Sequence, residues 1–194
     1  ALMLVLFAGE GRRRVDTAVA YLGMVLPLTA GILAAGTVVD DPVLELQLAA
    51  PRPAWRLLLE RLALVLAVAA VAALGFQLLS LALGVPLAGL GGIARRQLAW
   101  LVPSVALVGL STATALGAGH SMGGALLSGF AWIVQVIIRE GISATAWGRY
   151  LYLFMGARQP EHPALAANQL TLLALAAVLT LAGAVMLRRG ERYL

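Results

Sequence analysis

The chain has 194 residues, of which 61% are hydrophobic and only 12% are charged, and its mean hydropathy is +0.93. This composition excludes an ordinary water-soluble domain, which could not bury so much apolar surface. The net charge of +5 depends on arginine alone, and the arginines stand between the apolar runs, as interface anchors do, rather than on a nucleic-acid-binding face. The absence of cysteine excludes disulfides, thiol catalysis and cysteine-ligated metal.

The first apolar run, residues 1–9, is too short to cross a bilayer and is interpreted as the end of a truncated helix. Because the chain starts at Ala1 and not at a methionine, we expect the natural protein to begin earlier. The first complete span is predicted over residues 17–39, since about 20 apolar residues are needed to cross roughly 30 Å of hydrocarbon. Pro27 is compatible with this span because neighbouring helices can satisfy the freed carbonyl.

Residues 40–56, DDPVLELQLAAPRPAWR, form the most polar segment between two long apolar runs. Asp40 or Asp41 can cap a short helix that has Pro42 in its first turn. The two prolines of residues 51–53 must end that helix. The sequence therefore predicts a helix of about two turns that lies at the membrane interface and does not span.

Four more spans are predicted after this segment. They cover residues 57–83, about 97–118, 125–138 and 170–187. The glycine-rich residues 84–92 are expected to form a turn between the first two of these spans. The sequence thus predicts an all-α membrane protein with a single transmembrane domain over residues 1–194. This domain has five complete transmembrane helices and the end of a sixth at the N-terminus.

A long, irregular segment, residues 139–169, separates the last two spans. It contains RYLYLF at residues 149–154, and its arginine and aromatic content fits an amphipathic piece at the membrane surface. A soluble loop is the alternative. The last span is closed by RRGERYL, residues 188–194, whose three arginines can anchor it at the interface.

Small residues recur every four positions in the third complete span, at Gly109, Ala113 and Gly117. This spacing permits a close approach between membrane helices. The alternative is that small residues are simply abundant in this alanine- and glycine-rich chain.

The sequence GHSMGG, residues 119–124, matches the G-x-S-x-G nucleophile elbow of α/β-hydrolases around Ser121. That elbow requires a strand before the serine and a helix after it, whereas both neighbours here are predicted spans. The acid and histidine of a triad would have to come from Glu140 or Glu161 with His162, and no glycine run for an oxyanion hole is present. A tight turn between two helices is the preferred interpretation.

Ionisable side chains are missing from the middle of every predicted span. A carrier driven by protons or sodium normally has such groups near mid-membrane, so their absence favours transport powered from outside the chain. Gln77 and Gln135 are the largest polar residues within the spans. They can line a pathway or hydrogen-bond a neighbouring helix, and the second role is commoner.

Residues 40–62 resemble the stretch between the second and third transmembrane helices of ABC type 2 permeases. In that family an acidic residue, a short helix, a proline-containing turn and an arginine-rich start of the next span follow in this order. The matching residues are Glu45, Leu46, Leu48, Ala49, Pro51, Pro53, Arg56 and Arg61. The long segment before the last span, and a last span that starts near Asn168 and ends in a basic tail, fit the same family.

The resemblance implies a permease subunit of an ATP-driven exporter in the plasma membrane. Two such subunits pair, and each docks a separate cytoplasmic ATPase that binds ATP and Mg²⁺ and acts on the short helix. The residues expected to couple to the ATPase are Asp40, Asp41, Glu45, Gln47, Arg52, Trp55 and Arg56. The chain has no G-x-x-x-x-G-K-[ST] phosphate loop and no lysine, so ATP hydrolysis is expected in a partner and not in this chain.

The family topology would place residues 40–56, residues 119–124 and the C-terminal tail in the cytoplasm. Six arginines would then lie inside and eight outside, which runs mildly against the positive-inside tendency. Two other functions stay open: a membrane-embedded assembly subunit that transports nothing, and a membrane serine hydrolase at Ser121. The few fixed charges favour a lipid-like or amphiphilic cargo over a small ion.

Overall fold

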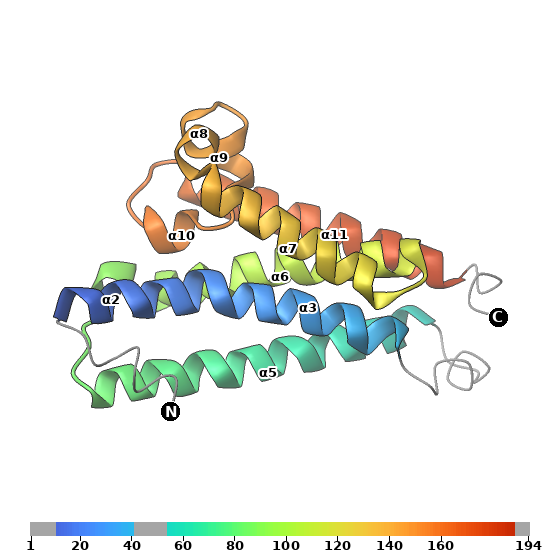
Figure 1. The fold of residues 1–194 in the computed structure, drawn as a ribbon, viewed down its shortest axis with the longest axis horizontal. Coiled ribbons are helices and arrows are strands. Elements are labelled where there is room, and N and C mark those ends of the chain that lie inside the picture. The colour runs from blue at the N-terminus through green and yellow to red at the C-terminus, as the bar shows by residue number, and fades with distance from the viewer. Residues whose placement is uncertain (1–10, 41–53, 189–194) are drawn as a thin grey trace.

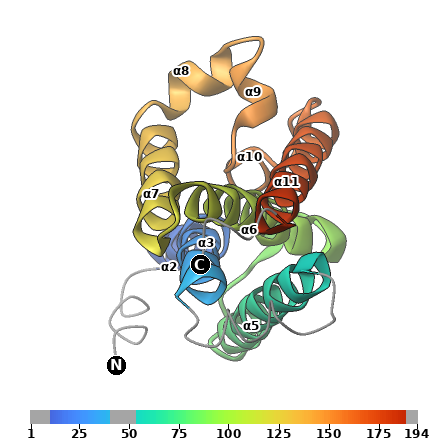
Figure 2. The same cartoon turned by 90° about the vertical axis from the view of Figure 1, so that its right-hand side faces the viewer.

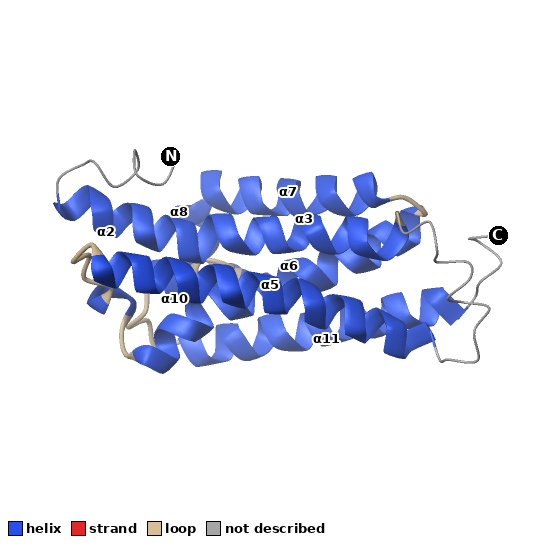
Figure 3. Ribbon diagram, turned by 90° about the horizontal axis from the view of Figure 1, so that it is seen from below, coloured by secondary structure: helices blue, strands red, loops and turns tan. Residues whose placement is uncertain are grey.

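The chain folds as a bundle of long helices that lie side by side (Figure 1). The computed structural model describes residues 11–40 and 54–188, and all regular structure within them is helical (Figure 3). The predicted all-α class is therefore confirmed for this part of the chain. Residues 1–9 and most of the predicted interfacial helix lie outside the described residues.

Four helical stretches are long and apolar enough to cross a membrane. They are Arg14–Val39, Trp55–Ala82, Ile93–Ala118 and Leu165–Leu187. They belong to α2 (Gly11–Ala20) with η1 (Tyr21–Val25) and α3 (Leu26–Val39), to α5 (Ala54–Ala82), to α6 (Ile93–Ala118) and to α11 (Leu165–Arg188). The fourth predicted span, residues 125–138, corresponds to α7 (Ser121–Ile137), which has only 17 residues, so a count of five is not confirmed.

Several predicted boundaries differ from the observed ones, among them the start of α5, which lies at Ala54 and not at 57. Helix α6 begins at Ile93 and includes the two arginines that were expected to precede it. Helix α7 begins at Ser121 and not at 125, because the His120 side chain caps it by accepting a hydrogen bond from the Gly123 N–H. Helix α11 begins at Leu165, shortly after Pro163, whose fixed φ suits an approach to a helix start.

The first span is one long helix with a π-helical turn, η1, just before Pro27. The N–H of Leu26 donates to the carbonyl of Tyr21, five residues back. Pro27 has no N–H to continue the α-helical ladder, and single π turns accommodate such a defect without breaking a helix. The expectation that Pro27 lies within a span is confirmed.

Helix α6 lies at the centre of the bundle, between α3, α5, α7 and α11 (Figure 2). Of the 18 most apolar consecutive residues of α6, 67% are buried, whereas the corresponding shares are 28% in α5 and 22% in α11. A Cβ on Gly109 would lie only 3.0 Å from the carbonyl oxygen of Ala176, so this glycine allows α11 to pack closely on α6. The packing role predicted for the small residues of α6 is thus confirmed at Gly109.

The bundle has two ends with different content (Figure 1). One end, called the Asp40 end, holds Asp40, the start of α5, the turn at residues 119–120 and the described end of α11. The other, called the η2 end, holds the loop 83–92, which contains η2 (Ala88–Leu90), and the segment 138–164. The described parts of the segments expected to share one membrane face therefore lie at the same end.

The segment 138–164 contains three short helices, α8 (Arg139–Ala144), α9 (Gly148–Leu151) and α10 (Met155–Arg158). The expectation of a surface segment fits α8, which has no buried residue. It is wrong for residues 152–155, which are at most 6% exposed and pack against Met24, Leu107 and Leu172 of three long helices. Their aromatic and aliphatic side chains favour burial inside the bundle over the interface.

Candidate functional site

The predicted coupling segment is described only at its two ends. Asp41, Glu45, Gln47 and Arg52 lie outside the described residues. Asp40 is exposed at the end of α3, where its N–H donates to the Gly36 carbonyl at 3.1 Å. Trp55 and Arg56 are exposed in the first turn of α5. The segment thus begins and ends at the same end of the bundle, on accessible side chains.

A hydrogen bond ties the two helices that flank this segment. The Arg61 guanidinium Nη1 donates to the carbonyl of Thr37 at 2.5 Å, across 24 positions in the sequence. The sequence matched Arg61 to the family pattern, whereas the structure gives it a contact between α5 and α3. Arg56 forms an exposed pair with Glu60, with Nε and Oε1 3.4 Å apart, which adds little to this link.

Trp55 lies at an apolar hollow between the start of α5 and the end of α11. The hollow has a volume of about 370 Å³ and is lined by Trp55, Leu58, Leu59, Thr180, Leu181, Ala184 and Val185. Next to the hollow, a Cβ on Gly183 would lie 3.8 Å from the Leu58 side chain of α5 and 3.2 Å from the Leu116 side chain of α6. The start of α5 is therefore packed where α5, α6 and α11 meet.

The two glutamines proposed for a pathway are both hydrogen-bonded to protein groups. Gln77 of α5 exchanges two hydrogen bonds with Gln97 of α6, at 3.3 and 2.9 Å. Gln135 of α7 donates to the carbonyl of Leu151 and accepts from the N–H of Leu153, at 3.1 and 2.7 Å. Both side chains thus join neighbouring elements, as the commoner of the two expectations states, and a pathway role stays a prediction.

Met24 of η1 is the point at which three parts of the chain meet. The indole N–H of Trp132, from α7, donates to the Met24 carbonyl at 2.8 Å. The guanidinium of Arg158, from α10, lies 3.5 Å from the Met24 sulfur. A Cβ on Gly23 would collide with the Cβ of Ala157, so glycine is what allows α10 to rest on the π turn. The sequence did not predict this cluster. The feature that could have indicated it is Pro27, which follows the π turn.

Asn168 holds the buried segment onto α11. Its side chain is 1% exposed, and its Nδ2 donates to the carbonyls of Arg149 and Tyr152 at 2.9 and 3.0 Å. The sequence noted Asn168 only as a feature of the last span. Burial raises the pKa of Tyr152, and the nearby positive charges of Arg158 and Arg139 oppose that rise, so the phenol stays neutral at physiological pH.

The GHSMGG motif is a helix start and not a nucleophile elbow. Gly119 takes a positive φ of 74°, which ends α6, and His120 caps α7, in which Ser121 is the first residue. Both neighbours of Ser121 are helices, so the strand that an elbow requires is missing. The described residues also contain no cluster of three or more His, Asp or Glu side chains that could hold a metal ion.

The middle of the bundle carries hydroxyl groups instead of charges. The side-chain oxygens of Ser111 and Thr112 on α6 and of Ser128 on α7 are buried without a hydrogen-bond partner. The sequence did not single out these residues, because serine and threonine are common in membrane helices.

Comparison of the chain with protein-family models, with curated proteins and with solved structures finds no match.

Proposed function

We propose that the chain is the transmembrane permease subunit of an ATP-binding cassette exporter, a multi-pass protein of the plasma membrane. It forms the substrate path together with a second permease subunit. A separate cytoplasmic ATPase, which binds ATP and Mg²⁺, drives it through residues 40–56. The proposal depends on the resemblance of residues 40–62 to ABC type 2 permeases and on the way the ends of this segment are anchored.

The anchoring is the structural observation that carries the proposal. The segment leaves α3 at Asp40 and returns at Trp55, and the bond from Arg61 to Thr37 ties these two helices close to the segment. Trp55 and Leu58 also lie against α11. A force on residues 41–53 would thus reach α3, α5 and α11 together, which is what coupling to an ATPase requires.

The charge distribution gives independent support. Within the described spans, residues 17–39, 62–82, 97–118 and 165–187 contain no Asp, Glu, Lys, Arg or His. A carrier powered by a proton or sodium gradient needs ionisable groups at such depths. The buried hydroxyls of Ser111, Thr112 and Ser128 suit a weakly polar path, in keeping with an amphiphilic cargo.

A membrane-embedded assembly subunit is the alternative, since it would share the apolar helices but would not need an ATPase. Purification of the chain from its native membrane separates the two. We expect a stoichiometric partner that hydrolyses ATP, and we expect Glu45→Arg to release that partner. Glu140→Arg, on exposed α8 at the other end, is the matched control and should retain it. Retention by both variants would contradict the proposed coupling segment.

The side of the membrane can be tested directly because the chain contains no cysteine. Gln47→Cys places a single thiol in the proposed coupling segment, and Gly89→Cys places one in the loop at the η2 end, where a Cβ meets open space. A membrane-impermeant maleimide should label position 89 in intact cells and position 47 only in inverted vesicles. Labelling of position 47 in intact cells would exclude contact with a cytoplasmic ATPase.

A further inference from the structure

A groove runs between the last turns of α5 and the first turn of α6 at the η2 end. It has a volume of about 370 Å³ and is lined by Leu74, Gln77, Leu78, Leu81, Val85, Pro86, Leu87, Ile93, Arg96 and Gln97. Its two walls differ in chemistry: one consists of aliphatic side chains, and the other of two amides and a guanidinium. The proposed coupling segment begins and ends at the Asp40 end, so the proposed function leaves this groove without a role.

The polar wall presents hydrogen-bond donors. The indole N–H of Trp100, which can only donate, lies 2.7 Å from Gln97 Oε1 and so fixes the orientation of that amide. The reciprocal bonds then fix Gln77, whose Oε1 accepts from Gln97 Nε2 at 2.9 Å. Each amide nitrogen has two hydrogens, and the pair uses one from each. The remaining N–H groups favour an acceptor, such as an oxyanion, over a cation.

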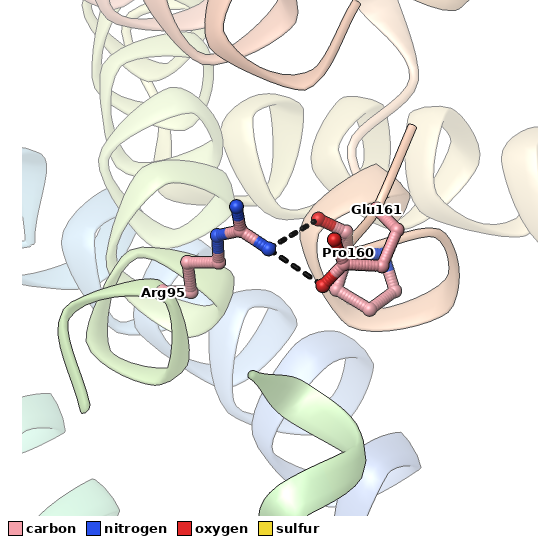
Figure 4. A network of polar contacts seen from close by, with 3 residues as sticks. All are labelled: Arg95, Pro160 and Glu161. Atoms are coloured by element: carbon pink, nitrogen blue, oxygen red, sulfur yellow. Dashed lines mark hydrogen bonds and ion pairs between the residues drawn. The ribbon is translucent and has the colours of Figure 1, made fainter. Parts of the chain in front are cut away.

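The two neighbouring arginines at the start of α6 have different surroundings. Arg95 turns to the loop before α11, where its Nη1 lies 2.6 Å from Glu161 Oε1 and 3.5 Å from the Pro160 carbonyl (Figure 4). Arg96 lines the groove, and its Nε is buried without a hydrogen-bond partner. No residue that lines the groove is acidic. The groove therefore carries a positive charge that no lining side chain neutralises.

The apolar wall faces outward from the bundle. Leu74 and Leu78 of this wall, and Val71 beyond it on α5, are 50%, 67% and 73% exposed, as expected for side chains that contact lipid tails. Arg96 lies three residues into α6 and Gln77 five residues before the end of α5, which is about 5–8 Å from the helix ends. The charged and amide groups thus lie near headgroup depth. Leu74 lies one turn deeper on α5 than Gln77, and the exposed Val71 continues the apolar surface toward the membrane centre.

We infer that this groove binds an anionic phospholipid, whose phosphate lies at Arg96 and the Gln77–Gln97 pair and whose acyl chain lies along Leu78 and Leu74 and continues past Val71. Only a ligand with both an anionic head and a long apolar tail matches both walls. A second copy of this chain matches the groove less well, because it would have to place a carboxylate next to Arg96 at headgroup depth. Basic pockets between membrane helices bind lipid headgroups in this way.

The test counts bound lipid by native mass spectrometry on the purified protein with any partner that remains attached. Delipidated protein is titrated with dioleoylphosphatidylglycerol or dioleoylphosphatidylcholine. We expect tighter binding of the anionic lipid, and about fivefold weaker binding in Arg96→Gln, as the loss of one headgroup charge contact predicts. Arg95→Gln is the matched control, because that side chain lies outside the groove, and it should bind as the wild type does.

A second variant keeps the test decisive if Arg96→Gln fails to fold. Leu78→Trp, at an exposed position, fills the apolar wall and should remove the tightly bound anionic lipid while Arg96 stays in place. Equal affinity for the two lipids would overturn the inference, as would equal losses in the two arginine variants. Competition by glycerol phosphate would indicate a soluble anion as the ligand. A change of oligomeric state in Leu78→Trp without loss of lipid would indicate that a second copy covers the groove.

Discussion

The two ends of the helical bundle are held by different interactions. At the η2 end, side chains from distant parts of the chain form hydrogen bonds with backbone groups, as Trp132 does with Met24 and Asn168 with Tyr152. At the Asp40 end, apolar packing of Leu58 and Leu116 around Gly183 is joined by the exposed bond from Arg61 to Thr37. Buried hydrogen bonds fix a geometry, whereas apolar contacts allow small sliding movements of packed helices.

This difference suggests that the η2 end stays fixed, and we call it the fixed end, while the helices move at the Asp40 end, which we call the working end. In the proposed exporter, the force of the ATPase enters at the Asp40 end, where α5 and α11 can shift against α6. The η2 end would then act as the fixed point, since residues 152–155 are packed among the long helices there. Substitutions at the two ends should therefore separate stability from transport, with the largest losses of stability at the η2 end.

Asn168→Leu should give the largest loss of stability. The leucine has a similar volume, but it leaves the buried carbonyls of Arg149 and Tyr152 without their donor. We expect a cost of about 2–3 kcal/mol, measured as the free energy of unfolding in mild detergent. Thr171→Ala, one turn further along α11 at a half-buried side chain, removes only an exposed hydrogen bond to the Ala167 carbonyl and should change little. Equal effects of the two substitutions would show that Asn168 does not hold the segment.

Gly23→Ala should come next, because the new Cβ would collide with Ala157 of α10. Overpacking of this kind costs about 1–3 kcal/mol. The double variant Gly23→Ala with Ala157→Gly returns the missing space and should recover most of the loss. The thermal midpoint and the rate of proteolysis within residues 138–164 would report both effects. Failure of the second substitution to rescue the first would mean that α10 does not rest on η1.

The sequence predicted the long helices better than it predicted the buried contacts at the η2 end. Helix α5 was predicted to within three residues at its start and one at its end, because a long apolar run in a membrane protein has few alternatives to a helix. Burial of residues 152–155 could not be foreseen, since it depends on Gln135 and Asn168, which are 18 and 16 positions away from the backbone groups that they bind. Apolar periodicity carries no information about which distant amide meets which backbone group.

The candidate site shows the same division. The short helix predicted within residues 40–56 from the prolines and aspartates stays a prediction, because residues 41–53 lie outside the described residues. The partners of Gln77 and Arg61 did not follow, because Gln97 and Thr37 are 20 and 24 positions away. The GHSMGG motif matches a nucleophile elbow in sequence only. Its predicted helical neighbours argued against an elbow, and the structure has helices on both sides of it.

Trp132→Phe should have a smaller effect at the fixed end. The ring contact with Phe154, whose centroid lies 6.2 Å away, is largely kept, and the hydrogen bond to the Met24 carbonyl is lost. One such bond in a membrane protein contributes about 1 kcal/mol. Trp147→Phe, at a side chain that is 84% exposed, is the matched control and should leave the unfolding free energy unchanged. Indistinguishable variants would show that the indole N–H does not secure η1.

Arg56→Gln at the Asp40 end should change stability least and transport most. Its exposed pair with Glu60 spans one helical turn, and such pairs contribute about 0.3–0.5 kcal/mol. If residues 40–56 receive the force of an ATPase, however, the variant should fold normally, retain about wild-type unfolding free energy and lose a large part of cargo-stimulated ATP hydrolysis. Arg139→Gln, which removes an exposed arginine paired with Glu140 at the η2 end, should leave both quantities unchanged. Parallel loss of stability and hydrolysis in Arg56→Gln would mean that the Asp40 end is structural, and the proposed contrast between a fixed and a working end would fail.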